Sequence, residues 1–190
     1  KYGPNGEVRK IKGHNMLYVV IGTFILFFGW FGFNAGSTVN GNDLRIAVII
    51  TNTFLAGAAG AVTAAYVRLL QTGRISAADT CNGALAGLVA VTAPCAFIAP
   101  WAAVVVGAIG ALVMLLGVSI IDTKLKIDDP VGASSVHGVA GVWGLLAVGI
   151  FADGTYGVSG LIAGNASQLL AQVIAAAVAV AWGLGMGLIL

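Results

Sequence analysis

Long apolar stretches follow one another along almost the whole chain, and this pattern narrows the possible folds more than any other feature. About 20 apolar residues in a helix cross ~30 Å of hydrocarbon. Mean hydropathy is +1.00 and only 8% of residues are charged, values far outside the range of soluble globular domains. The strict alternation typical of a membrane β-barrel is missing, so the spans should be helical. We therefore predict an all-α integral membrane protein.

Six transmembrane helices are predicted from the apolar stretches and the polar breaks between them. Residues 1–15 are polar, turn-rich and basic, and are predicted to form a cytoplasmic loop. The chain starts with Lys rather than Met and shows no cleavable signal peptide, so we expect a fragment or a processed chain. The predicted spans are 16–38, 44–70, 77–98, 101–121, 130–152 and 166–190.

Basic residues predict the orientation, because short positively charged loops stay on the cytoplasmic side. With an even number of spans, both ends lie on one side, and Arg45 is the one basic residue predicted on the other. We therefore expect a multi-pass protein of the plasma (inner) membrane with both ends cytoplasmic. The basic residues on the cytoplasmic side would be Lys1, Arg9, Lys10, Lys12, Arg68, Arg74, Lys124 and Lys126.

A single histidine follows a charged turn into the fifth predicted span. We expect that helix to start near Pro130, a favoured first-turn residue that follows two acidic residues. Steps of about 100° per residue place His137 on a strip of small residues and Trp143 on the opposite, bulkier side. Ionisable groups inside a span are costly and tend to mark ion or proton paths. His137 is thus a candidate proton relay, with a histidine that merely holds two helices together as the alternative.

A second informative stretch, GWFGFNAGST at 29–38, closes the first span. Helical stepping places Trp30, Phe33 and Ser37 on one face together with two glycines. An aromatic ring with a hydroxyl one turn further along can hold a small cation through the ring face and one hydrogen bond. The alternative is an aromatic belt at the membrane interface with glycines that pack helices. Residue types alone leave both interpretations open.

The other polar residues of the spans are predicted to be structural. Asn52 and Asn82 should hydrogen-bond neighbouring helices, and Ser76 with Asp79 should form a capping box at the start of the third span. Glycines four residues apart should allow close helix packing, as at Gly32/Gly36 and Gly83/Gly87.

Motifs for catalysis and for tightly bound groups are missing. The sequence contains no GxSxG, HExxH or CxxC and no pair of intramembrane aspartates. Cys81 and Cys95 lack metal-ligand partners and are not expected to form a disulfide. Basic patches interleaved with aromatic residues are missing too, which argues against a nucleic-acid partner. We predict that the protein is not an enzyme and holds no cofactor or metal.

Three motifs in register carry a specific resemblance. GWFGFNAGS at 29–37, CNGALAGLVAVTAPC at 81–95 and DDPVGASSVHGVAGVWG at 128–144 together resemble the ammonium transporter family, the Amt/Mep/Rh proteins. The likeness extends over essentially all 190 residues. It implies a bundle of eleven transmembrane helices assembled as a homotrimer, with a separate pore in each subunit. Residues 1–190 look like a partial ammonium transporter domain, helices six to eleven, which is the second half of that fold.

The resemblance also implies roles for single residues. His137 matches the second of twin pore histidines, whose partner belongs to the first half of the fold. Phe33 resembles a phenylalanine of the pore gate, Trp30 a pore-lining tryptophan beside the histidines, and Ser37 a serine that hydrogen-bonds ammonium at an outer recruitment site. Where some relatives carry an acidic residue, this chain has Gly132, so the resemblance does not predict the details of the cytoplasmic mouth.

The implied function is transmembrane ammonium transport in the lipid bilayer. Ammonium would be recruited outside, lose a proton and pass as ammonia, because burying an ion in a dry pore costs on the order of several kcal/mol. Methylammonium would be an analogue, and a PII-type signal protein would be a cytoplasmic partner. An ammonium sensor or receptor on the same scaffold and an Rh-type neutral-gas channel are the alternatives. Half a pore is not expected to conduct by itself.

Overall fold

The computed structural model describes residues 1–4, 7–9, 11 and 13–189, and these residues form helices, turns and loops. No strand occurs in the described part of the chain, only isolated bridges at Tyr2–Val8 and Asp153–Ser159, so the predicted all-α fold is confirmed. Lys10, Lys12 and Leu190, which belong to the predicted loop and last span, lie outside the described residues. The α-helices are α1 (Met16–Gly36), α2 (Arg45–Thr72), α3 (Ala77–Thr92), α4 (Pro100–Ser119), α5 (Ala140–Phe151) and α6 (Ala166–Ile189).

Two π-helical turns and one 3-10 turn complete the described elements. η1 (Ile120–Leu125) extends α4, η2 (Ser134–Val139) leads into α5, and η3 (Leu161–Ala163) precedes α6. Within the described ranges, five helical segments are long and apolar enough to cross a membrane: α1, α2, α4 with η1, η2 with α5, and α6. α3 has only 16 residues. The chain leaves α3 after Thr92 and turns before Pro100, whereas the predicted third span runs to residue 98.

The expected helix start near Pro130 is wrong. Pro130 and Val131 form a turn, and Gly132 adopts a positive φ of 75°. Because a left-handed backbone interrupts a right-handed helix, helical structure resumes only after Gly132. Asp129 Oδ2 then accepts a hydrogen bond of 3.0 Å from the Ser134 backbone N–H. The helix opens as the π turn η2, which includes His137.

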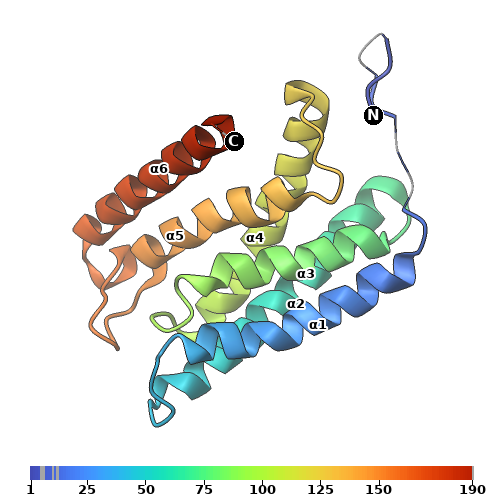
Figure 1. Cartoon of the computed structure of the whole chain (residues 1–190). Coiled ribbons are helices and arrows are strands. Elements are labelled where there is room, and N and C mark those ends of the chain that lie inside the picture. The colour runs from blue at the N-terminus through green and yellow to red at the C-terminus, as the bar shows by residue number, and fades with distance from the viewer. Residues whose placement is uncertain (5–6, 10, 12, 190) are drawn as a thin grey trace.

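The helices surround α3, as Figure 1 shows. α3 contacts α1, α2, α4 and α5, and α6 packs against α5. α1 and α6 lie at opposite edges of the assembly (Figure 1). α1 ends near Ser37, where α2 begins after a short connection. We call this the Ser37 end, and the opposite one the His14 end.

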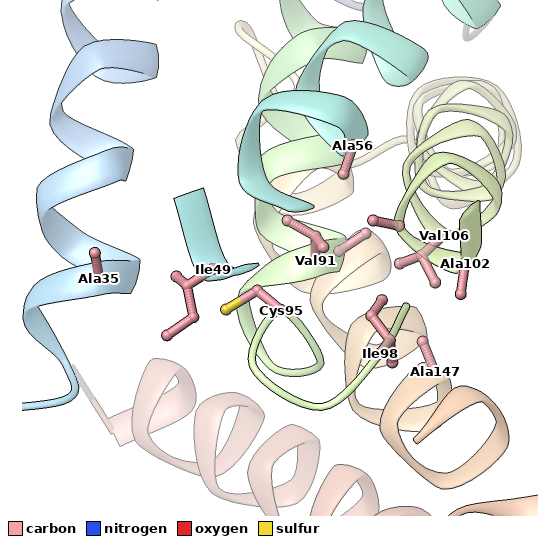
Figure 2. Close-up of a cluster of buried hydrophobic side chains, with 11 residues drawn as sticks. Ala35, Ile49, Ala56, Val91, Cys95, Ile98, Ala102, Val106 and Ala147 are labelled. Atoms are coloured by element: carbon pink, nitrogen blue, oxygen red, sulfur yellow. The ribbon is translucent and has the colours of Figure 1, made fainter. Parts of the chain in front are cut away.

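Helices α2, α3 and α4 approach each other at backbone distance. A methyl group at Gly60 or Gly83 would overlap the backbone of the other residue, and one at Gly87 or Gly107 would overlap the Ala56 carbonyl oxygen. Such contacts require small residues, as predicted for Gly83/Gly87. By contrast, no described atom lies within 4 Å of the space beside Gly32 or Gly36. Figure 2 shows the neighbouring buried cluster, whose labelled side chains include Ile49, Val91, Cys95, Ile98 and Val106.

Buried polar groups fasten the connections between helices. Asn52 Nδ2 donates to the Cys95 and Ile98 carbonyl oxygens, each at 2.8 Å, and thereby holds the turn after α3. Asn82 Nδ2 donates to the Val131 carbonyl oxygen at 3.0 Å. Both amides therefore have the structural role that we predict from the sequence.

The expected capping box of α3 is half formed. The Ser76 side chain accepts from the Asp79 backbone N–H at 3.3 Å. Asp79 does not return the bond, because its carboxylate pairs with Arg68 at 2.9 Å. Cys81 and Cys95 are both free, as predicted.

Candidate functional site

Three aromatic rings form a continuous line between α1 and η2. Trp30 and His137 are nearly parallel, with ring centroids 6.4 Å apart and an interplanar angle of 17°. Phe33, one turn further along α1, meets the Trp30 ring edge-on at 6.0 Å and 80°. The structure therefore brings together three residues that the sequence analysis selected from two distant motifs.

Trp30 is held in this orientation by the last residue of α3. Its Nε1–H donates to Thr92 Oγ1 at 2.8 Å, and the Thr92 hydroxyl donates to the Leu88 carbonyl oxygen at 2.7 Å. Because the single hydroxyl proton points at Leu88, the Thr92 oxygen can only accept from the indole. The one N–H of Trp30 is thus occupied, and the ring presents only its faces and edges to its surroundings. Sequence reasoning missed Thr92.

Ser37 lies at the end of α1 beside a hollow of about 260 Å³. α1, α2 and the turn after α3 line this Ser37 pocket, with Phe33, Asn34, Ser37, Arg45, Cys95 and Phe97 among its residues. The Ser37 hydroxyl donates to the Phe33 carbonyl oxygen at 2.7 Å. Its oxygen lone pairs therefore remain able to accept from a ligand.

Asn34 also lines the Ser37 pocket, and its amide has one fixed orientation. Its Nδ2 donates to Thr53 Oγ1 at 3.0 Å, and the Thr53 hydroxyl donates to the Ile49 carbonyl oxygen at 2.6 Å. Since Thr53 has no second proton to give, the amide must turn its NH₂ group toward Thr53. Asn34 Oδ1 is left buried and has no hydrogen-bond partner among the described residues. The sequence analysis did not select Asn34, although it lies inside one of the recognised motifs.

His137 stands between two further hollows. The hollow of about 290 Å³ on the α1 side is also lined by Tyr18, Leu26 and Asn82. The hollow of about 460 Å³ lies between α5 and α6. His137 is exposed, and no hydrogen bond to its ring nitrogens is present within the described part of the chain. Both ring nitrogens are therefore available for hydrogen bonds to a solute in these hollows.

Charged groups meet at the rim of the Ser37 pocket. Arg45 forms a forked ion pair with Asp43, with a shortest N–O distance of 2.6 Å. Hydrogen bonds from the Arg45 guanidinium and backbone lower the pKa of the Asp43 carboxyl. The guanidinium also lies over the Tyr156 ring, 5.8 Å from its centroid. Among the described residues, no cluster of three potential metal ligands occurs.

The structure thus arranges the four predicted residues in order along one surface. We call these four residues the aromatic wall, in the spatial order Ser37, Phe33, Trp30 and His137. Its first member borders the Ser37 pocket, and its last member borders the two other hollows. The aromatic wall thus joins a hollow lined by a hydroxyl and an amide to hollows beside one imidazole.

Comparison with known proteins gives the family. The model described as Ammonium Transporter Family matches residues 1–190, and the chain belongs to this family. It is 51% identical over 195 aligned residues to Ammonium transporter Amt2 of Archaeoglobus fulgidus, covering 98% of this chain and 42% of that protein. It is 38% identical to Ammonium transporter 1 member 1 of Oryza sativa subsp. japonica, covering 87% of this chain and 37% of that protein.

Solved structures agree with this assignment. A structure titled Sensor Amt Protein superposes with a TM-score of 0.92 at 39% identity, covering 100% of this chain and 46% of that one. Mep2 of Candida albicans superposes with a TM-score of 0.85 at 34% identity, covering 93% of this chain and 40% of that one. The chain therefore spans less than half the length of these relatives.

Proposed function

We propose that residues 1–190 form one side of a pore for transmembrane ammonium transport, and that a first half of the fold, as in the longer relatives, supplies the facing side. The aromatic wall is the observation that carries this proposal. It leads from the Ser37 pocket to His137, and among the described residues that line the three adjoining hollows Arg45 is the one Asp, Glu, Lys or Arg. The names of the relatives as ammonium transporters support ammonium as the solute.

Recruitment is assigned to Ser37 and Phe33. Ammonium has only N–H donors, so it requires acceptors, and the Ser37 oxygen is an acceptor beside the pocket. The Phe33 ring face adds a cation–π contact of about 0.5–2 kcal/mol. These two contacts replace part of the water shell that ammonium loses on entry.

Deprotonation is assigned to the passage along the aromatic rings, with Phe33 as gate and Trp30 as lining. An ion that passes these rings loses its hydration, whereas neutral ammonia does not carry that cost. The Trp30 N–H is already bonded to Thr92. His137 is therefore the first member of the aromatic wall with a proton to exchange, and we assign it the relay.

The proposal includes a membrane arrangement. Helix directions put Arg68 and Lys124 at the His14 end, opposite Arg45. We infer that the Ser37 end faces outward, that both ends of the chain are cytoplasmic and that the membrane is the plasma (inner) membrane. Exposed apolar residues on α1, such as Phe24 and Phe28, suit contact with lipid or with another subunit of a homotrimer. A PII-type signal protein would bind at the His14 end.

The test uses the completed protein, by which we mean residues 1–190 joined behind the first half of the Archaeoglobus fulgidus relative. In proteoliposomes it should take up labelled methylammonium, and ammonium should elicit a current. His137→Ala should lower uptake or its charge coupling about tenfold or more, because the relay loses its proton carrier, while the oligomer still assembles. His14→Ala, which changes an exposed histidine of the leader, is the matched control. Parent-like uptake and current in His137→Ala would remove His137 from the relay.

An ammonium sensor is the second candidate, and the similarity to Sensor Amt Protein favours it. In that case the completed protein would bind ammonium, for example with a rise in Tm, without uptake. Uptake without current would instead indicate an Rh-type neutral-gas channel. The same two measurements therefore separate all three candidates.

A further inference from the structure

The Ser37 pocket has one charged side chain in its described lining, and that side chain is a cation. The lining includes Arg45 but not its partner Asp43. A pocket that is to attract ammonium would be opposed by an uncompensated guanidinium at this place. The role of this ion pair is therefore not explained by the transport proposal alone.

The ion pair has one fixed geometry. Arg45 Nε lies 3.1 Å and 2.9 Å from the two Asp43 carboxylate oxygens, and Nη2 lies 2.6 Å from Oδ2. The Arg45 backbone N–H donates to the same carboxylate at 2.9 Å, and Tyr156 supports the guanidinium plane. Both side chains are partly buried, with 34% of the Arg45 surface and 15% of the Asp43 surface exposed. Partial burial limits solvent screening, so the charge of each partner is felt in the pocket.

We propose that the Asp43–Arg45 ion pair sets the electrostatic potential of the Ser37 pocket and thereby its affinity for monovalent cations such as ammonium. The affinity part rests on the proposed function. Asp43 cancels the repulsion that Arg45 exerts, and Arg45 limits the attraction that Asp43 exerts. The pair holds the pocket near neutrality, which favours capture of a cation that must also be released inward.

The two partners should therefore act in opposite directions. In the completed protein, Arg45→Gln leaves the carboxylate unbalanced and should lower the methylammonium concentration for half-maximal uptake by about two- to fivefold. Asp43→Asn leaves the guanidinium unbalanced and should raise it by a similar factor. Both effects should shrink in high salt. A pair that only fastened the connection between α1 and α2 would give changes of the same sign.

Two controls separate charge from structure. Arg45→Lys keeps the charge but loses the planar fork, so it should behave like the parent. The Arg68–Asp79 ion pair, with a distance of 2.9 Å and 28% and 24% exposure, is a matched pair at the His14 end. Arg68→Gln and Asp79→Asn should leave the half-saturation concentration unchanged.

A second measurement does not depend on transport. Ser37→Cys introduces an exposed thiol at the pocket, and it is combined with Cys95→Ser because Cys95, although buried, lines the same pocket. The ratio of its labelling rates with a cationic and an anionic methanethiosulfonate reagent reports the local potential. This ratio should rise with Arg45→Gln and fall with Asp43→Asn, by about two- to fivefold each. An unchanged ratio, or shifts of the same sign, would overturn the proposal. If the labelling ratio shifts in opposite directions but the completed protein with Ser37 in place shows no uptake, the electrostatic proposal holds and ammonium transport is refuted.

Discussion

The three helices α2, α3 and α4 differ from the elements that carry the candidate site in how they use small residues. α4 buries nine residues, whereas α1 buries two and α6 buries one. In the packed helices, glycines replace side chains so that backbones touch. On α1 and α6, most glycines face space that no described residue fills, as at Gly29, Gly32 and Gly185. The same residue type thus builds a rigid support on one side and a smooth open surface on the other.

The sharpest test of this contrast is a single methyl group placed on either side. Gly87→Ala would press its Cβ into the Ala56 carbonyl oxygen, and should cost about 1–3 kcal/mol or abolish folding, as overpacking does. Gly185→Ala adds the same methyl to the open face of α6 and should change stability by less than about 1 kcal/mol. Thermal unfolding in detergent measures both. Equal losses of Tm would show that the open glycines are packed as well.

An intermediate effect is expected where the packed helices meet the aromatic wall, at Thr92. Thr92→Val keeps the shape but leaves the Trp30 N–H without its acceptor, which costs about 1–3 kcal/mol when buried. We expect uptake by the completed protein to fall about fivefold or more, and Tm to fall by a few degrees, in line with that cost. Thr92→Ser should restore uptake, because it restores the hydroxyl.

The control for Thr92 is Thr80→Val. Thr80 also donates to a carbonyl of its own helix, that of Ser76, but no described side chain donates to it. Thr80→Val should therefore leave uptake unchanged. Equal losses in Thr80→Val and Thr92→Val would point to a general weakening of α3 and not to the orientation of Trp30.

The smallest effect should be the pH dependence at the Ser37 end. Arg45 lowers the pKa of Asp43 in the folded protein, so the ion pair contributes stability above the unfolded pKa. That contribution disappears as the pH falls through the folded pKa, below about pH 4. Tm of the parent should therefore decline in this range more than that of Asp43→Asn. Parallel declines in the two proteins would indicate that other carboxylates dominate.

Much of the fold follows from composition and periodicity, because the bilayer allows few alternatives. The length of the apolar stretches predicts the helices. His137 is selected because an ionisable group inside a span is costly to bury. Helical stepping predicts the face formed by Trp30, Phe33 and Ser37. The structure places these four residues in line, whereas their roles in transport stay predictions.

The features that could not be predicted from the sequence depend on local backbone conformation or on contacts between distant segments. π and α turns have the same amino-acid composition, so the sequence of 128–144 does not predict the π turn η2. The start of the helix depends on the backbone conformation of Gly132. The Trp30 donor of Thr92, the Thr53 partner of Asn34 and the Tyr156 ring beside Arg45 come from other helices or loops. Small-xxx-small spacing likewise does not tell Gly83/Gly87, which pack, from Gly32/Gly36, which face open space.

The near-parallel stacking of Trp30 on His137 also has an optical consequence. A protonated imidazole against an indole quenches its fluorescence more strongly than a neutral one, through charge transfer from the excited ring. With the other three tryptophans replaced by phenylalanine, emission from Trp30 would follow the protonation of His137 in real time. Trp30 is thus an intrinsic fluorophore beside His137, the residue to which we assign the proton relay.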